Sequence, residues 1–333
     1  MYNNRKAGEF PKLLEGIKPG AAILYSAKMR KKSLGAGCVR ERLPVTLLLV
    51  LYIILCIMAV QVSGCSDSDS TRKERPSLVV FVAASLRDVV QEVGLSFALT
   101  HDVDLVYNFA GSNTLAQQIK ASRAADVFLS ANVDWVDFLE KVNLLVPGSR
   151  RNFLSNRLVV VSRKDAHFQF YNPLDPHDSF DPRALATLNF SFLALADPEA
   201  VPAGRYAKAF LESVELDGGS LWRALKDKVA PTADVRAALG LVESDPMIIG
   251  VVYRTDVTTS DKTKLLYEVP STLHPAITYC ATALKDRPNS GLVEEYLDFL
   301  SSPDAAAVYK NYGFLQETRT FEECMLRKTW VKP

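Results

Sequence analysis

The sequence carries almost no net charge. Its 39 lysines and arginines are balanced by 38 aspartates and glutamates, which leaves a formal net charge of +1. A chain this evenly balanced produces no long-range field that would attract a polyanion. No nucleic-acid partner is therefore expected.

Cysteine and histidine are scarce as well. The 333 residues include 5 cysteines and 4 histidines, and none of the histidines has metal-ligand spacing. A disulfide-rich scaffold and a zinc module are thus excluded, and no cofactor or metal cation is expected. An oxidising compartment would permit a disulfide between Cys280 and Cys324, but the sequence does not show that the two approach each other.

Motifs for catalysis are missing too. The chain has no G-x-S-x-G elbow, no phosphate-binding P-loop and no H-E-x-x-H pair. The acidic segment at 66–70 lacks the glycine and the distal glutamate of a calcium loop. An enzyme remains an alternative, but no residue pattern favours it.

One long apolar run stands out near the N-terminus. Residues 43–62 are uncharged, follow a basic stretch and end at V-S-G-C (62–65). A basic stretch, an apolar stretch and small residues before a break are typical of a secretory signal. Because V-S-G-C resembles the lipobox of bacterial lipoproteins, Cys65 is the predicted lipid-attachment site. Residues 1–65 are then an N-terminal extension with a signal peptide, and residues 66–77 a polar tether.

An uncleaved membrane anchor is the alternative for this run, since roughly 20 apolar residues are enough to cross a bilayer. Either interpretation places everything after Cys65 outside the cytoplasm, because the basic flank stays inside. Met29 begins a second basic stretch and is a second possible start of the protein.

The rest of the chain alternates between β-rich runs and amphipathic stretches. Repeated β-α-β units predict an α/β fold with mostly parallel sheets that helices cover on both faces. A Pro- and Asp-rich stretch at 171–182 indicates a surface loop. The expected strands are 78–83, 103–110, 126–131, 157–163, 191–198, 247–256 and 274–284; the expected helices are 86–99, 115–123, 203–214, 231–244 and two within 290–314.

Four strand-to-helix turns begin with small hydroxyl residues or bare backbone. They lie at 84–85, 111–114, 201–204 and 232–235. Taken singly, each is explained by N-capping, because Ser, Thr and Asp cap helices in any α/β protein. Helix N-termini also present unpaired N–H groups and about half a positive charge each. If several point into one cleft, they form an anion site without a charged side chain.

Seven ordered segments resemble the periplasmic molybdate-binding proteins of ABC importers. The resemblance runs from about Leu78 to about Gly313, across nearly the whole body after the tether. The segments are V-F-V-A-A-S-L-R-D (80–88), N-F-A-G-S-N-T-L-A-Q-Q-I (108–119), A-D-V-F-L-S-A-N (125–132), S-N-R-L-V-V-V (155–161), D-P-E-A-V-P-A-G-R-Y-A-K (197–208), D-V-R-A-A-L-G-L-V-E (234–243) and I-G-V-V-Y-R-T-D (249–256).

This resemblance implies a two-lobed type II periplasmic binding protein fold with the ligand cleft between the lobes. It places lobe one at 77–161 plus 256–316 and lobe two at 162–255, with residues 317–333 as a C-terminal extension. Carried over residue by residue, the contacts to molybdate fall on Ser85, Ser112, Ala203, Val235 and Tyr253.

The resemblance also implies a function and partners. The protein would be a monomer that binds molybdate, and tungstate as well, and delivers it to a membrane permease and its ATPase. A binding protein for sulfate, phosphate or ferric ion is the alternative within the same class. An enzyme on the same two-lobed fold is the alternative from a different class, because a fold does not settle a function.

Overall fold

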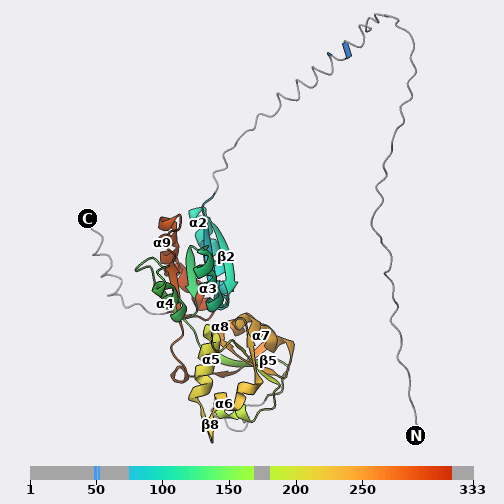
Figure 1. Ribbon diagram of the computed structural model, residues 1–333. Coiled ribbons are helices and arrows are strands. Elements are labelled where there is room, and N and C mark those ends of the chain that lie inside the picture. Colours follow the sequence, from blue (N-terminus) through green and yellow to red (C-terminus); the bar gives the residue numbers. More distant parts are fainter. Residues whose placement is uncertain (1–48, 51, 53–74, 169–180, 317–333) are drawn as a thin grey trace, which may run out of the picture. The chain divides into compact units, whose positions relative to one another are not determined.

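The computed structural model describes residues 49–50, 52, 75–168 and 181–316 (Figure 1). Nearly all of the predicted signal peptide, most of the tether, nearly all of the expected loop at 171–182, and the whole of the C-terminal extension, with Cys65 and Cys324, lie outside these residues. Among the residues that are described, no helix is long and apolar enough to cross a bilayer. The chain divides into two compact units, Met1–Arg72 and Lys73–Pro333, and the fold below is that of the second unit.

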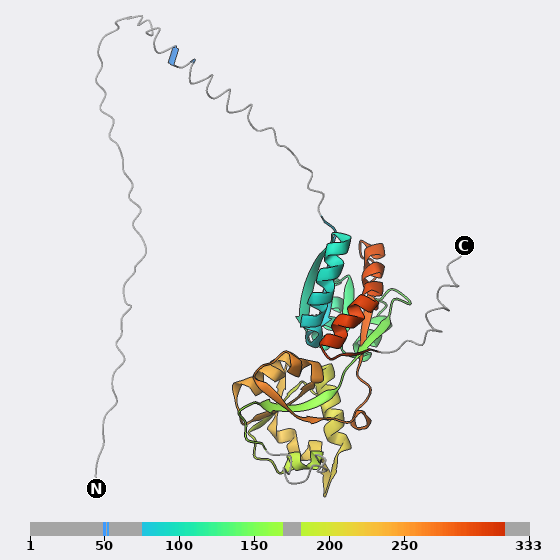
Figure 2. The same cartoon turned by 180° about the vertical axis from the view of Figure 1, so that it is seen from behind.

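Two main sheets form the body, and each belongs to a separate lobe (Figures 1 and 2). The sheet of lobe one has the order β13 (Leu315–Gln316), β4 (Arg151–Ser155), β12 (Thr278–Ala283), β3 (Val127–Ser130), β1 (Ser77–Ala83), β2 (Asp104–Ala110). The sheet of lobe two has the order β11 (Thr263–Glu268), β5 (Leu158–Arg163), β10 (Ile248–Tyr253), β6 (Phe192–Ala196), β9 (Val229–Thr232). A short hairpin joins β7 (Glu215–Leu216) to β8 (Gly219–Ser220).

Helices follow most of the strands, as the alternation in the sequence predicts. Lobe one contains η1 (Ala84–Leu86), α2 (Arg87–His101), α3 (Ser112–Ser122), α4 (Asp134–Lys141), α9 (Ser290–Phe299) and α10 (Pro303–Asn311). Between β5 and β12 lie η2 (Pro182–Ala186), α5 (Pro202–Ser213), α6 (Leu221–Leu225), η3 (Lys226–Lys228), α7 (Val235–Ser244), α8 (Arg254–Thr258) and η4 (Ser271–Leu273).

The interior strand β1 shows why helices cover both faces of this sheet. Successive side chains of a strand point to opposite faces. Val80 and Val82 accordingly pack in one hydrophobic cluster, with the buried side of α2, while Phe81 packs in the other, with α3 and α4. A continuous apolar run is stable only where helices cover both faces of the sheet. This accounts for the position of β1 inside the sheet, between β3 and the edge strand β2.

Each sheet is mixed rather than mostly parallel. β1 runs parallel to β2 and β3, but β12 is antiparallel to both of its neighbours, β3 and β4. In lobe two, β10 is parallel to β6 and antiparallel to β5. β5 and β12 are the strands that receive the chain from the other lobe. A strand that begins at the cleft has to run away from it, against the strands that end there.

The lobe boundaries in the structure differ from those expected at 161/162 and 255/256. β5 pairs with β10 and β11, so residues 158–163 belong to lobe two. β11 lies in that same sheet, and the chain returns to lobe one only between Glu268 and Thr278. An apolar β-branched run such as 158–163 fits either sheet by its pattern, and hydrogen-bond pairing decides which one it joins.

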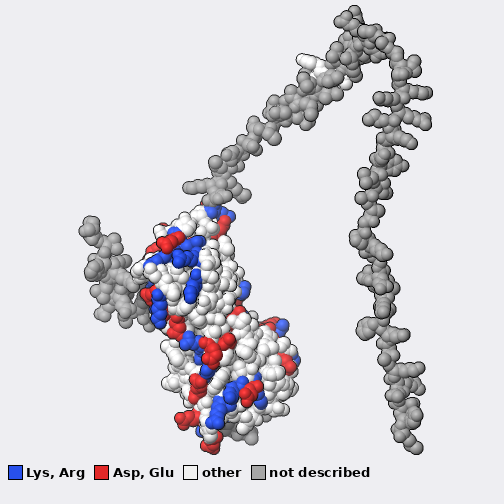
Figure 3. All heavy atoms as spheres, in the orientation of Figure 1, with Lys and Arg blue, Asp and Glu red and all other residues white. Residues whose placement is uncertain are grey.

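The parallel strands deliver their carboxyl ends to the space between the lobes. β1 and β2 end at η1 and α3, while β6 and β9 end at α5 and α7. In open α/β sheets ligands bind at the carboxyl ends of strands. The face of the body in Figure 3 carries both basic and acidic side chains.

Gly204 allows α5 to begin directly against the end of β6. A Cβ at Gly204 would lie 2.1 Å from the carbonyl oxygen of Ala196 and 2.3 Å from that of Asp197. Both are backbone atoms, which cannot rotate away. The first turn of α5, and with it Ala203 at the cleft, therefore depends on a missing side chain.

We expect Gly204→Ala to lower the free energy of unfolding by about 1–3 kcal/mol, the usual cost of overpacking. The matched control is Gly240→Ala in α7, where a Cβ meets nothing within 4 Å. That variant should raise stability by up to about 1 kcal/mol, because alanine is the better helix former. Urea denaturation of both variants measures the difference, and equal effects would contradict the close approach.

Candidate functional site

A pocket lies between the two lobes, at the strand ends described above. It is small and partly open to solvent: about 210 Å³ of space, some of it open solvent, lies between its walls. A space of this size suits a small, compact ligand rather than a drug-sized one. It is lined by Ala83, Ala84, Ser85, Gly111, Ser112, Ala131, Val201, Pro202, Ala203, Asp234, Val235 and Tyr253.

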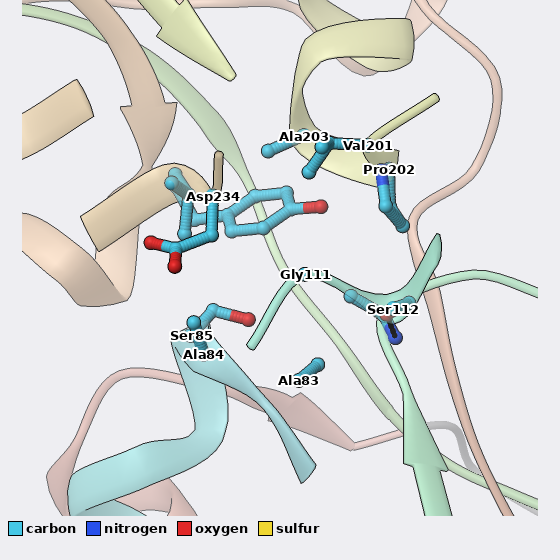
Figure 4. A pocket seen from close by; sticks show the side chains of 12 residues that line it. Ala83, Ala84, Ser85, Gly111, Ser112, Val201, Pro202, Ala203 and Asp234 are labelled. Carbon is cyan, nitrogen blue, oxygen red and sulfur yellow. Dashed lines mark hydrogen bonds between the residues drawn. The ribbon is translucent and has the colours of Figure 1, made fainter. Parts of the chain in front are cut away.

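All five residues predicted to contact the ligand line this one pocket (Figure 4). Lobe one contributes two of them and lobe two the other three, although up to 168 positions separate them in the sequence. They are Ser85, Ser112, Ala203, Val235 and Tyr253. The structure therefore brings together the residues that the turns and the resemblance single out.

Two α-helices begin at the pocket without a side-chain cap. α3 starts at Ser112 and α5 at Pro202, and no side chain in the described part of the chain caps either helix. α7 differs, because Asp234 Oδ1 accepts a hydrogen bond from the backbone N–H of Ala237 at 3.0 Å. The N-cap interpretation of the turns thus holds for Asp234 and not for Ser112. Uncapped helix starts direct partial positive charge into the pocket.

Both serine hydroxyls have a partner within the protein. Ser112 Oγ accepts a hydrogen bond from the backbone N–H of Ala131 at 3.0 Å. Ser85 Oγ lies 3.2 Å from the hydroxyl oxygen of Tyr279. In Figure 4 the Ser85 hydroxyl points into the space that Ser112 and Ala203 also border.

The Tyr253 hydroxyl is a buried donor without a partner. Tyr253 is 1% exposed, and its oxygen makes no hydrogen bond within the part of the chain that the structure describes. Burial raises the pKa of Tyr253 well above its usual value, so the hydroxyl keeps its proton and remains a donor. A buried polar group left unpaired costs stability. An acceptor from a ligand would remove that cost.

Asp234 is the one acidic side chain among the described residues that line the pocket. In Figure 4 its carboxylate is turned away from Ser112 and Pro202. Asp234 lies in one of the four predicted turns but is not a predicted contact. Val201, the first residue of the predicted turn at 201–204, and Ala131, the last residue of the expected strand 126–131, also line the pocket without being predicted contacts.

Arg236 joins the lobes beside the pocket. It follows the pocket residue Val235 in α7, and its Nη2 donates to Asp88 Oδ2 of lobe one at 2.6 Å. Its Nε also lies 2.8 Å from Asp256 Oδ1, in an ion pair without the alignment of a hydrogen bond. Asp256 is fully buried and accepts from the backbone N–H of Tyr253 at 3.2 Å. The Arg236 guanidinium thus pairs with the carboxylates of Asp88 and Asp256, and Arg236 does not line the pocket.

A second set of contacts joins α4 of lobe one to the segment around α5. Trp135 Nε1 donates to the carbonyl oxygen of Ala200 at 3.0 Å, and Arg205 Nη1 lies 2.5 Å from Asp134 Oδ2. Arg205 and Asp134 are each nearly half exposed, and exposed ion pairs contribute only about 0–1 kcal/mol. These contacts hold the lobes together around the pocket without strong stabilisation.

Metal-binding chemistry finds no support in the residues that the structure describes. Within them, no group of three or more His, Cys, Asp or Glu side chains could hold a metal ion. Cys280 is buried, and its thiol donates to Asn152 Oδ1 at 3.1 Å. A bond to Cys324 falls outside the described residues.

Comparisons with known proteins agree with this architecture. The sequence matches the family of bacterial extracellular solute-binding proteins over residues 78–315. Molybdate-binding protein ModA of Escherichia coli is 37% identical over 237 residues, which are 71% of this chain and 88% of that protein. Molybdate-binding protein ModA of Haemophilus influenzae is 32% identical over 238 residues, 71% of this chain and 89% of that protein.

A solved structure shares the fold. The periplasmic molybdate-binding protein of Azotobacter vinelandii superposes with a TM-score of 0.60 at 18% identity. The likeness covers 72% of this chain and all of that one. The predicted fold class, a two-lobed α/β protein of the type II periplasmic binding kind, is thereby confirmed.

The buried Asp256 predicts a pH dependence of stability. Burial raises its pKa to about 7, although the ion pair with Arg236 opposes the shift. In the unfolded chain the pKa of an aspartate is about 3.9. Between that value and about 7 the folded state therefore binds one more proton than the unfolded state. The stabilising contribution is therefore complete below about pH 4 and is lost as the pH rises through about 7.

Asp256→Asn remains uncharged at every pH and serves as the reference. We expect the unfolding free energy of the wild type, relative to this variant, to fall between about pH 4 and 7 and to level off at higher pH. Denaturant titrations of both proteins at several pH values measure the difference. A difference that stays constant or rises with pH would show that Arg236 keeps the carboxylate ionised.

Proposed function

The chain belongs to the bacterial extracellular solute-binding proteins, and we propose that it captures molybdate, with tungstate as a second ligand, for delivery to an ABC importer. The Tyr253 hydroxyl carries this proposal, because it is a buried donor aimed at a pocket that holds other donors. An oxyanion supplies the acceptors that such a pocket lacks. Relatives from two organisms are named for binding molybdate.

The charge of a molybdate dianion can be met without a cationic side chain. No lysine, arginine or histidine occurs among the described residues that line the pocket. Four helices begin at its edge within the described chain: η1, α3, α5 and α7. At about half a positive charge each, the starts of η1, α3 and α5 offset most of the two negative charges, whereas the start of α7 is already capped by the Asp234 carboxylate. Hydrogen bonds from the Ser85, Ser112 and Tyr253 hydroxyls and from backbone near Ala203 and Val235 complete the shell.

Other oxyanions fit this shell less well. Phosphate at neutral pH carries a proton and needs an acceptor in the site. Asp234 would be that acceptor, but its Oδ1 already caps α7 and its carboxylate is turned away. Sulfate brings no proton but is smaller than molybdate, so it cannot reach both lobes at good distances. Ferric ion prefers several anionic oxygens, and Tyr253 keeps its proton.

The proposal includes where the protein works and with what. We place the body outside the cytoplasm, as a monomer tethered by lipid at Cys65, where it meets a membrane permease and its ATPase. The tether from Ser66 to Ser77 would span at most roughly 40 Å at about 3.3 Å per residue. Within that reach the body can approach a permease without leaving the membrane surface.

Substitutions at the pocket test the ligand. We expect Ser85→Ala, Ser112→Ala and Tyr253→Phe each to weaken molybdate binding by about one to two powers of ten, since a hydrogen bond to a charged group contributes about 1.5–3 kcal/mol. Ser122→Ala is the matched control, because Ser122 lies at the other end of α3 and its hydroxyl donates to Gln118. Calorimetric titration of residues 66–333 measures all four.

Competition titrations in the same assay compare ligands. Tungstate should displace molybdate at nearly equal concentration, because the two anions share charge and size. Displacement by phosphate or sulfate at equal concentration, or wild-type affinity in all three pocket variants, would contradict the proposed site.

The lipid anchor has its own test. Cys65→Ser should release the protein from the membrane or leave it incorrectly processed, because the acylated residue is lost. Membrane fractionation together with the mass of the mature protein measures this. A variant that stays attached at its full precursor mass would instead support the uncleaved membrane anchor.

A further inference from the structure

We propose that Asn156 and Tyr279 fix the direction of the Ser85 hydroxyl proton, so that Ser85 acts only as a donor toward the bound anion. The inference rests on the proposed function in that it concerns selectivity for fully deprotonated oxyanions. Neither residue lines the pocket, and both act on the ligand through Ser85. They are positioning residues for a site that otherwise consists of neutral groups.

The three side chains form a hydrogen-bonded chain behind the pocket. Asn156 Nδ2 donates to Tyr279 Oη at 3.1 Å, and Tyr279 Oη lies 3.2 Å from Ser85 Oγ. All three residues are 5% exposed or less. Because bulk water is kept from this chain, each hydroxyl proton has to find a partner within the protein or the pocket.

The orientation of the Asn156 amide sets the direction in which protons are donated along these hydrogen bonds. Asn156 Oδ1 accepts a hydrogen bond from the backbone N–H of Arg157 at 2.8 Å. A backbone N–H can only donate, so the oxygen of the amide must be on that side. The amide nitrogen therefore faces the other way, where it donates to Thr255 Oγ1 at 2.9 Å as well as to Tyr279.

The polarity continues from Tyr279 to Ser85. Because Tyr279 Oη accepts from Asn156, its own proton is left for Ser85 Oγ, the other partner within reach. Burial raises the pKa of Tyr279, so that proton stays in place at neutral pH. Ser85 Oγ then accepts from Tyr279, and its own proton is directed to the pocket, where Figure 4 shows the hydroxyl pointing.

Ser112 is held in the same sense by a different group. Its Oγ accepts from the backbone N–H of Ala131, which can only donate, so its proton too is left for the pocket. A ligand that carries a proton, such as hydrogen phosphate, then meets a donor at both serines. One of its hydrogen bonds is lost. A fully deprotonated anion suffers no such loss.

The hydrogen-bonded chain of Asn156, Tyr279 and Ser85 also lies where the two lobes are connected. Asn156 is in the short segment between β4 and β5, Thr255 is in α8 of lobe two, and Tyr279 is in β12 of lobe one. The ring of Tyr279 packs against that of Tyr253, with 6.0 Å between their centroids. The donor direction of Ser85 is thus set by groups from both lobes.

Two substitutions alter the hydrogen-bonded chain of Asn156, Tyr279 and Ser85, called the relay below, without removing a pocket residue. Tyr279→Phe deletes the donor to Ser85, which can then rotate and accept a proton. The preference of the Tyr279→Phe variant for molybdate over hydrogen phosphate should fall at least about tenfold. Asn156→Asp turns the end of the chain into an acceptor, so that Tyr279 donates to it and Ser85 donates to Tyr279. Molybdate affinity should then fall about ten- to a hundredfold, because an oxygen lone pair faces the anion.

Tyr309→Phe is the control for the loss of a buried tyrosine hydroxyl. Tyr309 is also fully buried in lobe one, but its hydroxyl donates to the carbonyl oxygen of Leu300 and does not line the pocket. It should lose stability and keep the wild-type ratio of molybdate to phosphate affinity. Competition calorimetry at pH 7 to 8 provides the ratios.

A second measurement needs no ligand. In the ligand-free protein, the Tm loss of the double variant Ser85→Ala/Tyr279→Phe should be smaller than the sum of the two single losses, because the pair shares one hydrogen bond. If the wild type binds neither anion, the proposed function fails, while this cycle still tests whether Ser85 and Tyr279 share the hydrogen bond on which the relay depends. Additive Tm losses, or a wild-type affinity ratio in Tyr279→Phe, would overturn the relay.

Discussion

Buried donors without acceptors are the constraint around which this protein is organised. The Tyr253 hydroxyl and the uncapped starts of α3 and α5 all face one small space between the lobes. Each unsatisfied buried group costs roughly 1–3 kcal/mol. The cost is tolerated because strand ends, helix starts and crossover segments leave these groups no other partner. An oxyanion bound there, as proposed, would supply the missing acceptors and recover this cost.

The arrangement of full charges follows from this constraint. Arg236 is held between Asp88 and the buried Asp256, next to the pocket but outside it. A cation inside the pocket would attract any anion of the right sign, whatever its shape or protonation state. Dipoles and hydroxyls respond to the position of each oxygen and to the presence of a proton. The ion pairs serve the contact between lobes, and the neutral groups serve recognition.

Neutral hydroxyls discriminate only if their protons cannot turn. A serine in water both donates and accepts, and so accommodates a protonated ligand as readily as a deprotonated one. Here the backbone N–H of Ala131 donates to the Ser112 hydroxyl, and the proposed relay from Asn156 through Tyr279 donates to that of Ser85, so the proton of each serine is directed to the pocket. The residues behind the pocket thereby convert ambivalent groups into donors. On the proposed function, selectivity would depend on these residues as much as on the five expected contacts.

The sequence by itself determined the local structure and the chemistry of the contacts. Apolar runs such as 78–83 predict buried strands, and small residues at 111–114 and 201–204 predict helix starts, because these patterns reflect neighbouring residues alone. The resemblance added the five expected contact positions, and the fold brings these residues to one pocket.

Tertiary structure decided the rest. Residues 158–163 join lobe two through pairing with β10, which no run of apolar letters encodes. Asp234 caps its helix while Ser112 does not, although both occupy similar turns. Asn156 and Tyr279 lie 123 positions apart, and their contact depends on where the chain crosses between lobes. Local pattern reports which face of an element is buried, whereas hydrogen-bond partners depend on which distant segment arrives there.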